Sequence, residues 1–98
     1  MRERARVMEP IAHAIPKAIA DLLRDSPLSP GKVEFAWKAA VGPAMERGTA
    51  VRFDGRVLLV EARTSAWARE VSRSSRTILK RMETLLGPNV IQELKVRV

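Results

Sequence analysis

The residue pair Asp54-Gly55 constrains the fold of this chain more than any other feature of the sequence. Both residues tolerate positive φ, which a two-residue hairpin turn requires, and the segments on either side alternate apolar and polar residues. We therefore expect an antiparallel hairpin whose strands are Thr49–Asp54 and Arg56–Arg63. The second strand would place Leu58, Val60 and Ala62 on its buried face and Val57, Leu59, Glu61 and Arg63 on its outer face.

The chain before the hairpin has apolar residues at helical spacing. A first helix is expected over Pro16–Arg24, because proline is accepted best at the first helical position, and Ser26-Pro27 ends it. A second helix is expected to begin at the cap Ser29-Pro30 and to stop at Gly42-Pro43. One more short helical turn is expected over residues 43–47.

One long helix and one strand are expected after the hairpin. Thr64 or Ser65 can cap a helix over Ala66–Leu86, which Gly87-Pro88 would end. Residues Val90–Val98 alternate as a closing strand. The order helix, helix, strand, strand, helix, strand predicts an α+β domain of two layers with a three-stranded sheet. A single domain over residues 1–98 is expected, with the flexibility of residues 1–8 left open.

The long helix separates apolar from basic residues. At about 100° per residue its apolar residues share one narrow sector, which should pack on the sheet. Both tryptophans lie on apolar helix sides; an indole can stack on a nucleic-acid base, but this spacing favours core packing. The predicted core comprises Trp37, Trp67, Leu58, Val60, Val71, Ile78, Met82 and Leu85.

The opposite sector of this helix is basic. It carries Arg69, Arg73, Arg76 and Lys80 at positions i, i+4, i+7 and i+11, along about 16 Å of helix axis. The stretch 47–81 holds nine basic and three acidic residues, a net charge of +6, whereas the other nine basic and eight acidic residues leave +1. Such a concentrated positive field favours nucleic-acid phosphates or an acidic protein surface. The alternative is an ordinary solvated helix face.

The outer face of the sheet is a second candidate surface. Arg52, Lys95 and Arg97 would lie there beside Val57 and Leu59. Cations interleaved with apolar side chains suit a binding surface, and we expect this one to contact nucleic acid. Because the chain has no tyrosine and Phe53 is expected on the inner face, exposed aromatics for base stacking are largely excluded, and phosphate contact is expected rather than base-specific recognition. The alternative is that the two apolar residues are ordinary strand formers on an exposed face.

The composition argues against most chemistry. The chain has no cysteine and one histidine, His13, which excludes disulfides, thiolate nucleophiles and histidine-rich metal sites. The serines Ser72, Ser74 and Ser75 have no imidazole partner nearby, and no glycine-rich phosphate loop is present. We therefore expect no catalytic residue, metal or cofactor, and no enzyme.

The beginning of the chain lacks the apolar region of a secretory signal, and no apolar run is long enough to span a membrane. A cytoplasmic location without membrane contact is expected. Arg2, Arg4 and Arg6 have two interpretations, a small basic arm or a solvated tail.

Several short motifs in the segment from Ala36 to Val98 occur in a characteristic order. They are Trp37 with Val41-Gly42, then Asp54-Gly55 with Leu58 and Val60, then Ser65-Ala66-Trp67-Ala68, and last Gly87 before a terminal strand. In these motifs the chain resembles the DciA family, bacterial proteins that assist loading of the replicative helicase DnaB. The resemblance implies a K-homology-like domain, binding to DnaB and affinity for DNA. A GxxG loop is absent, so the K-homology clamp on four nucleotides is not carried over.

Three functions fit these observations. The favoured one is a non-enzymatic replication adaptor that binds DnaB and single-stranded or duplex DNA. The second is an RNA-binding K-homology-like module. The third is a protein-interaction domain whose cations meet an acidic partner without any nucleic acid.

Overall fold

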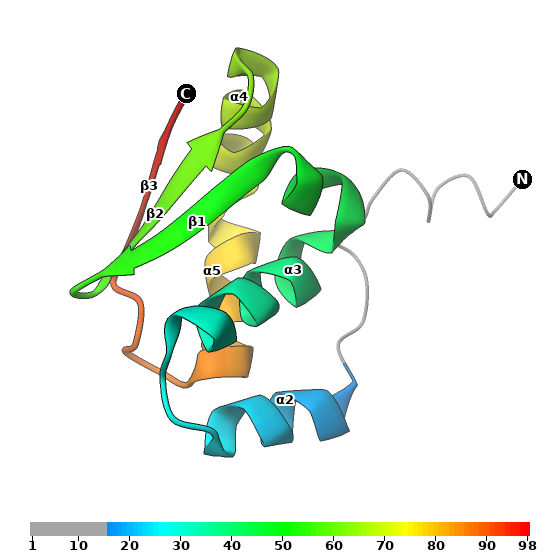
Figure 1. Cartoon of the computed structure of the whole chain (residues 1–98), viewed down its shortest axis with the longest axis vertical. Helices are drawn as coiled ribbons and strands as arrows, with labels where there is room; N and C mark the ends of the chain where they lie inside the picture. The colour runs from blue at the N-terminus through cyan, green and yellow to red at the C-terminus, as the bar shows by residue number, and fades with distance from the viewer. Residues whose placement is uncertain (1–15) are drawn as a thin grey trace, which may run out of the picture.

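The computed structural model describes residues 16–98, so the expectations for residues 1–8 and for His13 lie outside the described residues. The chain forms helices on one side of a three-stranded sheet, with α2 and α4 at opposite ends of the molecule (Figure 1). This is the expected α+β class. The elements in order are α2 (Lys17–Asp25), α3 (Pro30–Arg47), β1 (Thr49–Asp54), β2 (Val57–Ala62), α4 (Ser65–Arg73), α5 (Ser75–Leu86) and β3 (Glu93–Arg97).

The sheet has the strand order β1-β2-β3, with β1 antiparallel and β3 parallel to β2. The hairpin forms as expected, but its turn lies one residue further along the chain. Asp54 pairs with Val57, so the two turn residues are Gly55 and Arg56. Gly55 has a φ of 64°, and it supplies the positive φ that the first central position of such a turn requires. The second strand therefore begins at Val57 rather than at Arg56.

The single helix expected over Ala66–Leu86 is wrong, because the chain leaves the helical conformation at Ser74, whose φ is −96° and ψ is 5°. Serine is a weak helix former because its hydroxyl competes for backbone partners, and three serines lie within four residues here. The Ser74 N–H closes α4 on the Glu70 carbonyl at 3.1 Å, and the Ser74 carbonyl accepts from Ile78 N–H at 2.9 Å. The break lets α4 pack on β2 and β3 while α5 packs on α2 and α3.

The second helix bends where it was expected to stop. Gly42 has a φ of 85° and a ψ of 169°, which only glycine adopts without strain, and Pro43 begins the last turns of α3. The N-terminus of α3 is capped by Ser29, whose hydroxyl oxygen accepts a hydrogen bond from Lys32 N–H at 3.1 Å.

The core lies between the helices and the inner face of the sheet. Trp37 is buried at 2% exposure, whereas Trp67 is partly buried and packs on the edge of the core. No polar side-chain atom buried within residues 16–98 lacks a hydrogen-bond partner. The other residues of the predicted core, namely Leu58, Val60, Val71, Ile78, Met82 and Leu85, are all buried.

Candidate nucleic-acid interface

Four cations on α4 and α5 form the first candidate surface, which we term the helix row. Its members are Arg69, Arg73, Arg76 and Lys80, and all four are exposed. Arg69 and Arg73 each lie two residues from the fully buried Val71, a rotation of about 200° that turns them away from the core.

In α5, Arg76 and Lys80 stand in the same relation to the fully buried Ile78. Each helix therefore presents its own basic pair to solvent. The sequence predicted four cations along one straight helix axis. They do not follow one, because the break at Ser74 places two on α4 and two on α5.

The helix row is only lightly neutralised. Arg73 Nη1 lies 3.2 Å from Glu70 Oε1, with the two side chains 72% and 42% exposed. Such an exposed pair contributes about 0–1 kcal/mol to folding, so a phosphate can readily compete for the guanidinium. Within residues 16–98, the side chains of Arg69, Arg76 and Lys80 make no ion pair.

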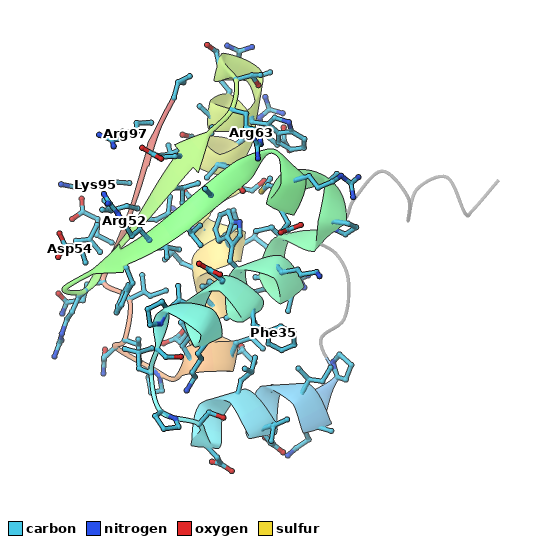
Figure 2. The ribbon with its side chains drawn as sticks, viewed as in Figure 1. Phe35, Arg52, Asp54, Arg63, Lys95 and Arg97 are labelled. Carbon is cyan, nitrogen blue, oxygen red and sulfur yellow. The ribbon has the colours of Figure 1, made fainter. Side chains whose placement is uncertain are left out.

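The outer face of the sheet carries the second candidate surface. Arg52, Lys95 and Arg97 project from it on the side away from the helices (Figure 2). The strand register places Arg52 opposite Leu59 and Leu59 opposite Lys95, so that these three residues cross the sheet in one line. We term this line the sheet row.

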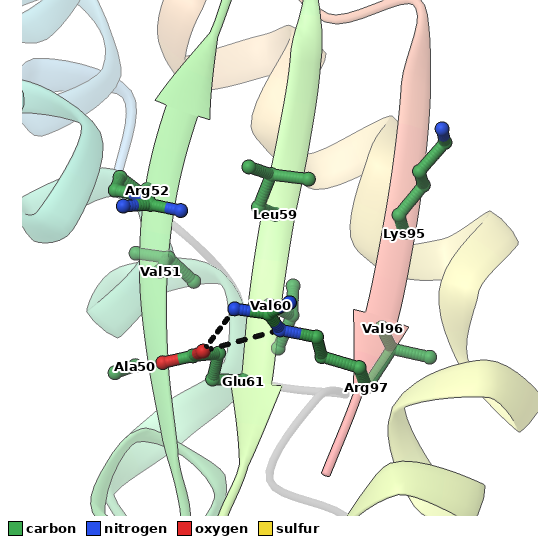
Figure 3. Close-up of a pocket in the computed structure, with 9 residues that line it drawn as sticks. All are labelled: Ala50, Val51, Arg52, Leu59, Val60, Glu61, Lys95, Val96 and Arg97. Carbon is green, nitrogen blue, oxygen red and sulfur yellow. Dashed lines mark hydrogen bonds and ion pairs between the residues drawn. The ribbon is translucent and has the colours of Figure 1, made fainter.

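Arg97 differs from the other two sheet cations, because it is paired. Its Nη2 and Nε donate hydrogen bonds to Glu61 Oε2 at 2.7 and 3.1 Å, across the neighbouring strand (Figure 3). Arg52 and Lys95 make no ion pair within the described part of the chain. The three sheet cations predicted from the sequence therefore share one face, but only two of them are available without displacing a carboxylate.

A shallow hollow with a volume of about 480 Å³ lies over this face. Its lining includes the sheet row together with Glu61 and Arg97 (Figure 3). The half-buried Leu59 is the apolar centre of the hollow, between Arg52 and Lys95. The arrangement combines positive charge at two sides with an apolar floor.

Sequence reasoning missed two features of the structure. It did not foresee that Glu61 would bind Arg97, since the two are 36 positions apart and meet only through β2–β3 pairing. It also overlooked Phe35, an aromatic side chain on α3 that is 48% exposed and lies toward α2 (Figure 2). The pairing of Glu70 with Arg73 could have been predicted from the sequence, because the two residues are three positions apart on one helix.

Two further features of residues 16–98 bear on other functions. Residues 16–98 contain no group of three or more histidine, cysteine or acidic side chains placed to hold a metal ion. None of the helices in this range is both long enough and apolar enough to cross a membrane.

Comparison with known proteins identifies the family. No curated protein and no solved structure matches the chain. The family described as "Dna[CI] antecedent, DciA" matches residues 5–96, which include all residues of the helix row and the sheet row. This match confirms the resemblance seen in the sequence motifs. Because it covers nearly the whole chain, the protein belongs to the DciA family, which is associated with helicase loading in DNA replication.

Proposed function

We propose that this protein is a non-enzymatic adaptor that binds the replicative helicase DnaB and DNA and so assists helicase loading. The family match supports the replication role. The observation that carries DNA binding is the helix row, in which four exposed cations face away from the core and only Arg73 has a carboxylate partner within residues 16–98. A cytoplasmic location follows from this role.

The contacts with DNA are made to phosphates. Exposed arginine and lysine side chains can neutralise phosphates without reading base edges. Trp37 is buried and the partly buried Trp67 packs against the core, so the proposal does not rely on base stacking by either tryptophan. Binding should therefore depend weakly on sequence and fall steeply as the salt concentration rises.

DNA binding is tested by titrating labelled single-stranded and duplex DNA at several salt concentrations. The variant Arg69→Gln, Arg73→Gln, Arg76→Gln, Lys80→Gln should bind at least tenfold more weakly and show a shallower salt dependence, roughly 0.7–0.9 lower in slope per lost phosphate contact. A control with the same loss of charge carries Lys17→Gln, Arg24→Gln, Lys38→Gln and Arg56→Gln, all at exposed positions. Equal weakening in the two variants would show that net charge, not the helix row, binds DNA.

Helicase binding is tested separately with purified DnaB, with and without nuclease treatment. Retention of DnaB after nuclease treatment supports a direct protein contact. Loss of DnaB after nuclease treatment would show that DNA merely bridges the two proteins. A preference for structured RNA over DNA in direct competition would instead favour the RNA-binding function.

A further inference from the structure

Three lines of side chains cross the outer face of the sheet, and they differ in which charged residues they contain. The register places Asp54, Val57 and Glu93 in the first line, and Ala50, Glu61 and Arg97 in the third. The sheet row, Arg52, Leu59 and Lys95, lies between them.

These lines differ in what they offer an anion. The first line has two exposed carboxylates, Asp54 and Glu93, and no cation. In the third line, Glu61 already occupies the guanidinium of Arg97. Of the three lines, only the sheet row presents cations that have no carboxylate partner within residues 16–98.

The charges determine the direction in which a polyanion can cross this face. Neighbouring lines are about 7 Å apart along the strands, because alternate residues share a face. A phosphate chain running parallel to the strands would approach the carboxylate of Asp54 or Glu93 on one side of the sheet row, and like charges repel at this range. On the other side it would meet the Glu61–Arg97 pair, whose charges neutralise each other. A chain running across the strands meets Arg52, then Leu59, then Lys95. Crossing is therefore the favourable direction.

The sheet row also has the dimensions and the chemistry to bind an unpaired nucleotide. Adjacent strands are about 4.8 Å apart, so the backbones of Arg52 and Lys95 are about 10 Å apart, with Leu59 midway. The hollow of about 480 Å³ leaves room above Leu59. A base that turns toward the protein can cover the leucine side chain while the phosphates on either side meet the two cations.

We infer that the outer face of the sheet is a binding site for single-stranded DNA, which crosses β1, β2 and β3 along Arg52, Leu59 and Lys95. This inference rests on the proposed DNA-binding function and deepens it by naming the form of DNA and its path. Duplex DNA keeps its bases inside the helix and presents phosphates, so it would leave Leu59 without a partner. The site therefore prefers single strands.

This site is separate from the helix row. The helix-row residues of α4 point away from Val71, which is buried on the inner side of the sheet where α4 contacts β2 and β3. The sheet row lies on the outer side of the same sheet (Figure 2). A substitution in one row therefore leaves the other row intact, and the two can be tested independently.

The experiment compares three variants of the full chain with wild type, using labelled oligothymidylate and a duplex of equal length. Arg52→Gln with Lys95→Gln should weaken single-strand binding roughly tenfold and lower its salt slope by about 1.4, the value for two lost phosphate contacts. Leu59→Ser should weaken single-strand binding several-fold and leave duplex binding within twofold of wild type. The control, Arg24→Gln with Lys38→Gln, removes the same charge from exposed sites on α2 and α3 and should change single-strand binding less than twofold.

The possible results separate this inference from the proposed function. If wild type binds no DNA at low salt, the proposed function fails first. If wild type binds DNA but the Arg52 and Lys95 double variant binds single strands as the control does, this site is overturned and DNA binding elsewhere stands. The site is also overturned if that variant binds single strands normally but loses purified DnaB, because the face then docks an acidic protein surface.

Equal losses of single-strand and duplex binding in Leu59→Ser would overturn the preference for single strands. Circular dichroism of each variant checks that the fold is retained.

Discussion

The indole Nε1 of Trp37 donates a hydrogen bond to Thr49 Oγ1 at 2.9 Å, and the Thr49 hydroxyl donates in turn to the Met45 carbonyl at 2.7 Å. This buried chain of hydrogen bonds joins the middle of α3 to its own last turn through the first residue of β1. It fixes where β1 begins and thereby the register of the sheet that carries Arg52. The hydrogen bonds that stabilise the fold here therefore also determine where Arg52 lies in the candidate site.

Replacing Thr49 by valine should destabilise the protein by about 1–3 kcal/mol, because it removes the acceptor of the buried Trp37 N–H with little change of shape. The measurement is chemical denaturation followed by tryptophan fluorescence. Thr49→Ser keeps the hydroxyl and should lose less stability than Thr49→Val. Equal losses in the two variants would show that the methyl group, not the hydrogen bond, matters here.

Replacing Gly48 by alanine should destabilise the protein by about 1–3 kcal/mol through overpacking. A Cβ atom at this position would lie 2.5 Å from Trp67 Nε1, and the φ of −88° means that the backbone itself is not strained. Gly31→Ala is the matched control, because its nearest neighbour lies 4.0 Å away and alanine favours the helix. Thermal unfolding should place Gly48→Ala below wild type and Gly31→Ala at or above it. The opposite order would contradict the steric argument.

Replacing Lys32 by methionine should lower the stability of the protein by weakening the contact at the C-terminal end of α2. Lys32 is 8% exposed, and its Nζ donates to the Ser26 carbonyl, the residue after α2, at 2.5 Å. Methionine keeps the apolar stem but leaves that carbonyl without its partner and removes a cation near the helix C-terminus, at a cost of about 1–3 kcal/mol. Denaturation midpoints provide the measurement. Lys38→Met, on the exposed side of α3, should change stability by less than 0.5 kcal/mol, roughly the range of surface substitutions.

Replacing Glu61 by glutamine should strengthen single-stranded DNA binding a few-fold, because it releases the guanidinium of Arg97 beside the sheet row. The free energy of unfolding should change by less than about 1 kcal/mol, since the side chains of the pair are 58% and 71% exposed. Glu34→Gln makes the same change of charge at an exposed position of α3 and is the control for the DNA titrations. If both variants gain affinity equally, net charge alone explains the effect.

The local pattern of the sequence was sufficient for the class of the fold and for most elements. Alternation around Asp54-Gly55 predicted the hairpin, and the Ser29 cap predicted the start of α3. It also predicted the buried face of β2 and the solvent-facing sides of α4 and α5, because helical and strand periods depend only on neighbouring residues. The exposure of Arg69 and Lys80 is of this kind.

The tertiary structure decided what depends on residues far apart in the chain. The break at Ser74 allows α4 and α5 to pack separately, but which partners they meet, the sheet for α4 and α2 with α3 for α5, was decided by the tertiary structure. The alignment of Arg52, Leu59 and Lys95 depends on the register of two strand pairings, one of which joins segments about 36 positions apart, as in the Glu61–Arg97 pair. A one-residue shift in either pairing would move every side chain of that strand to the other face. The number and spacing of the cations were therefore visible in the sequence, but which of them stand free and which are neutralised was set by the pairing of distant strands.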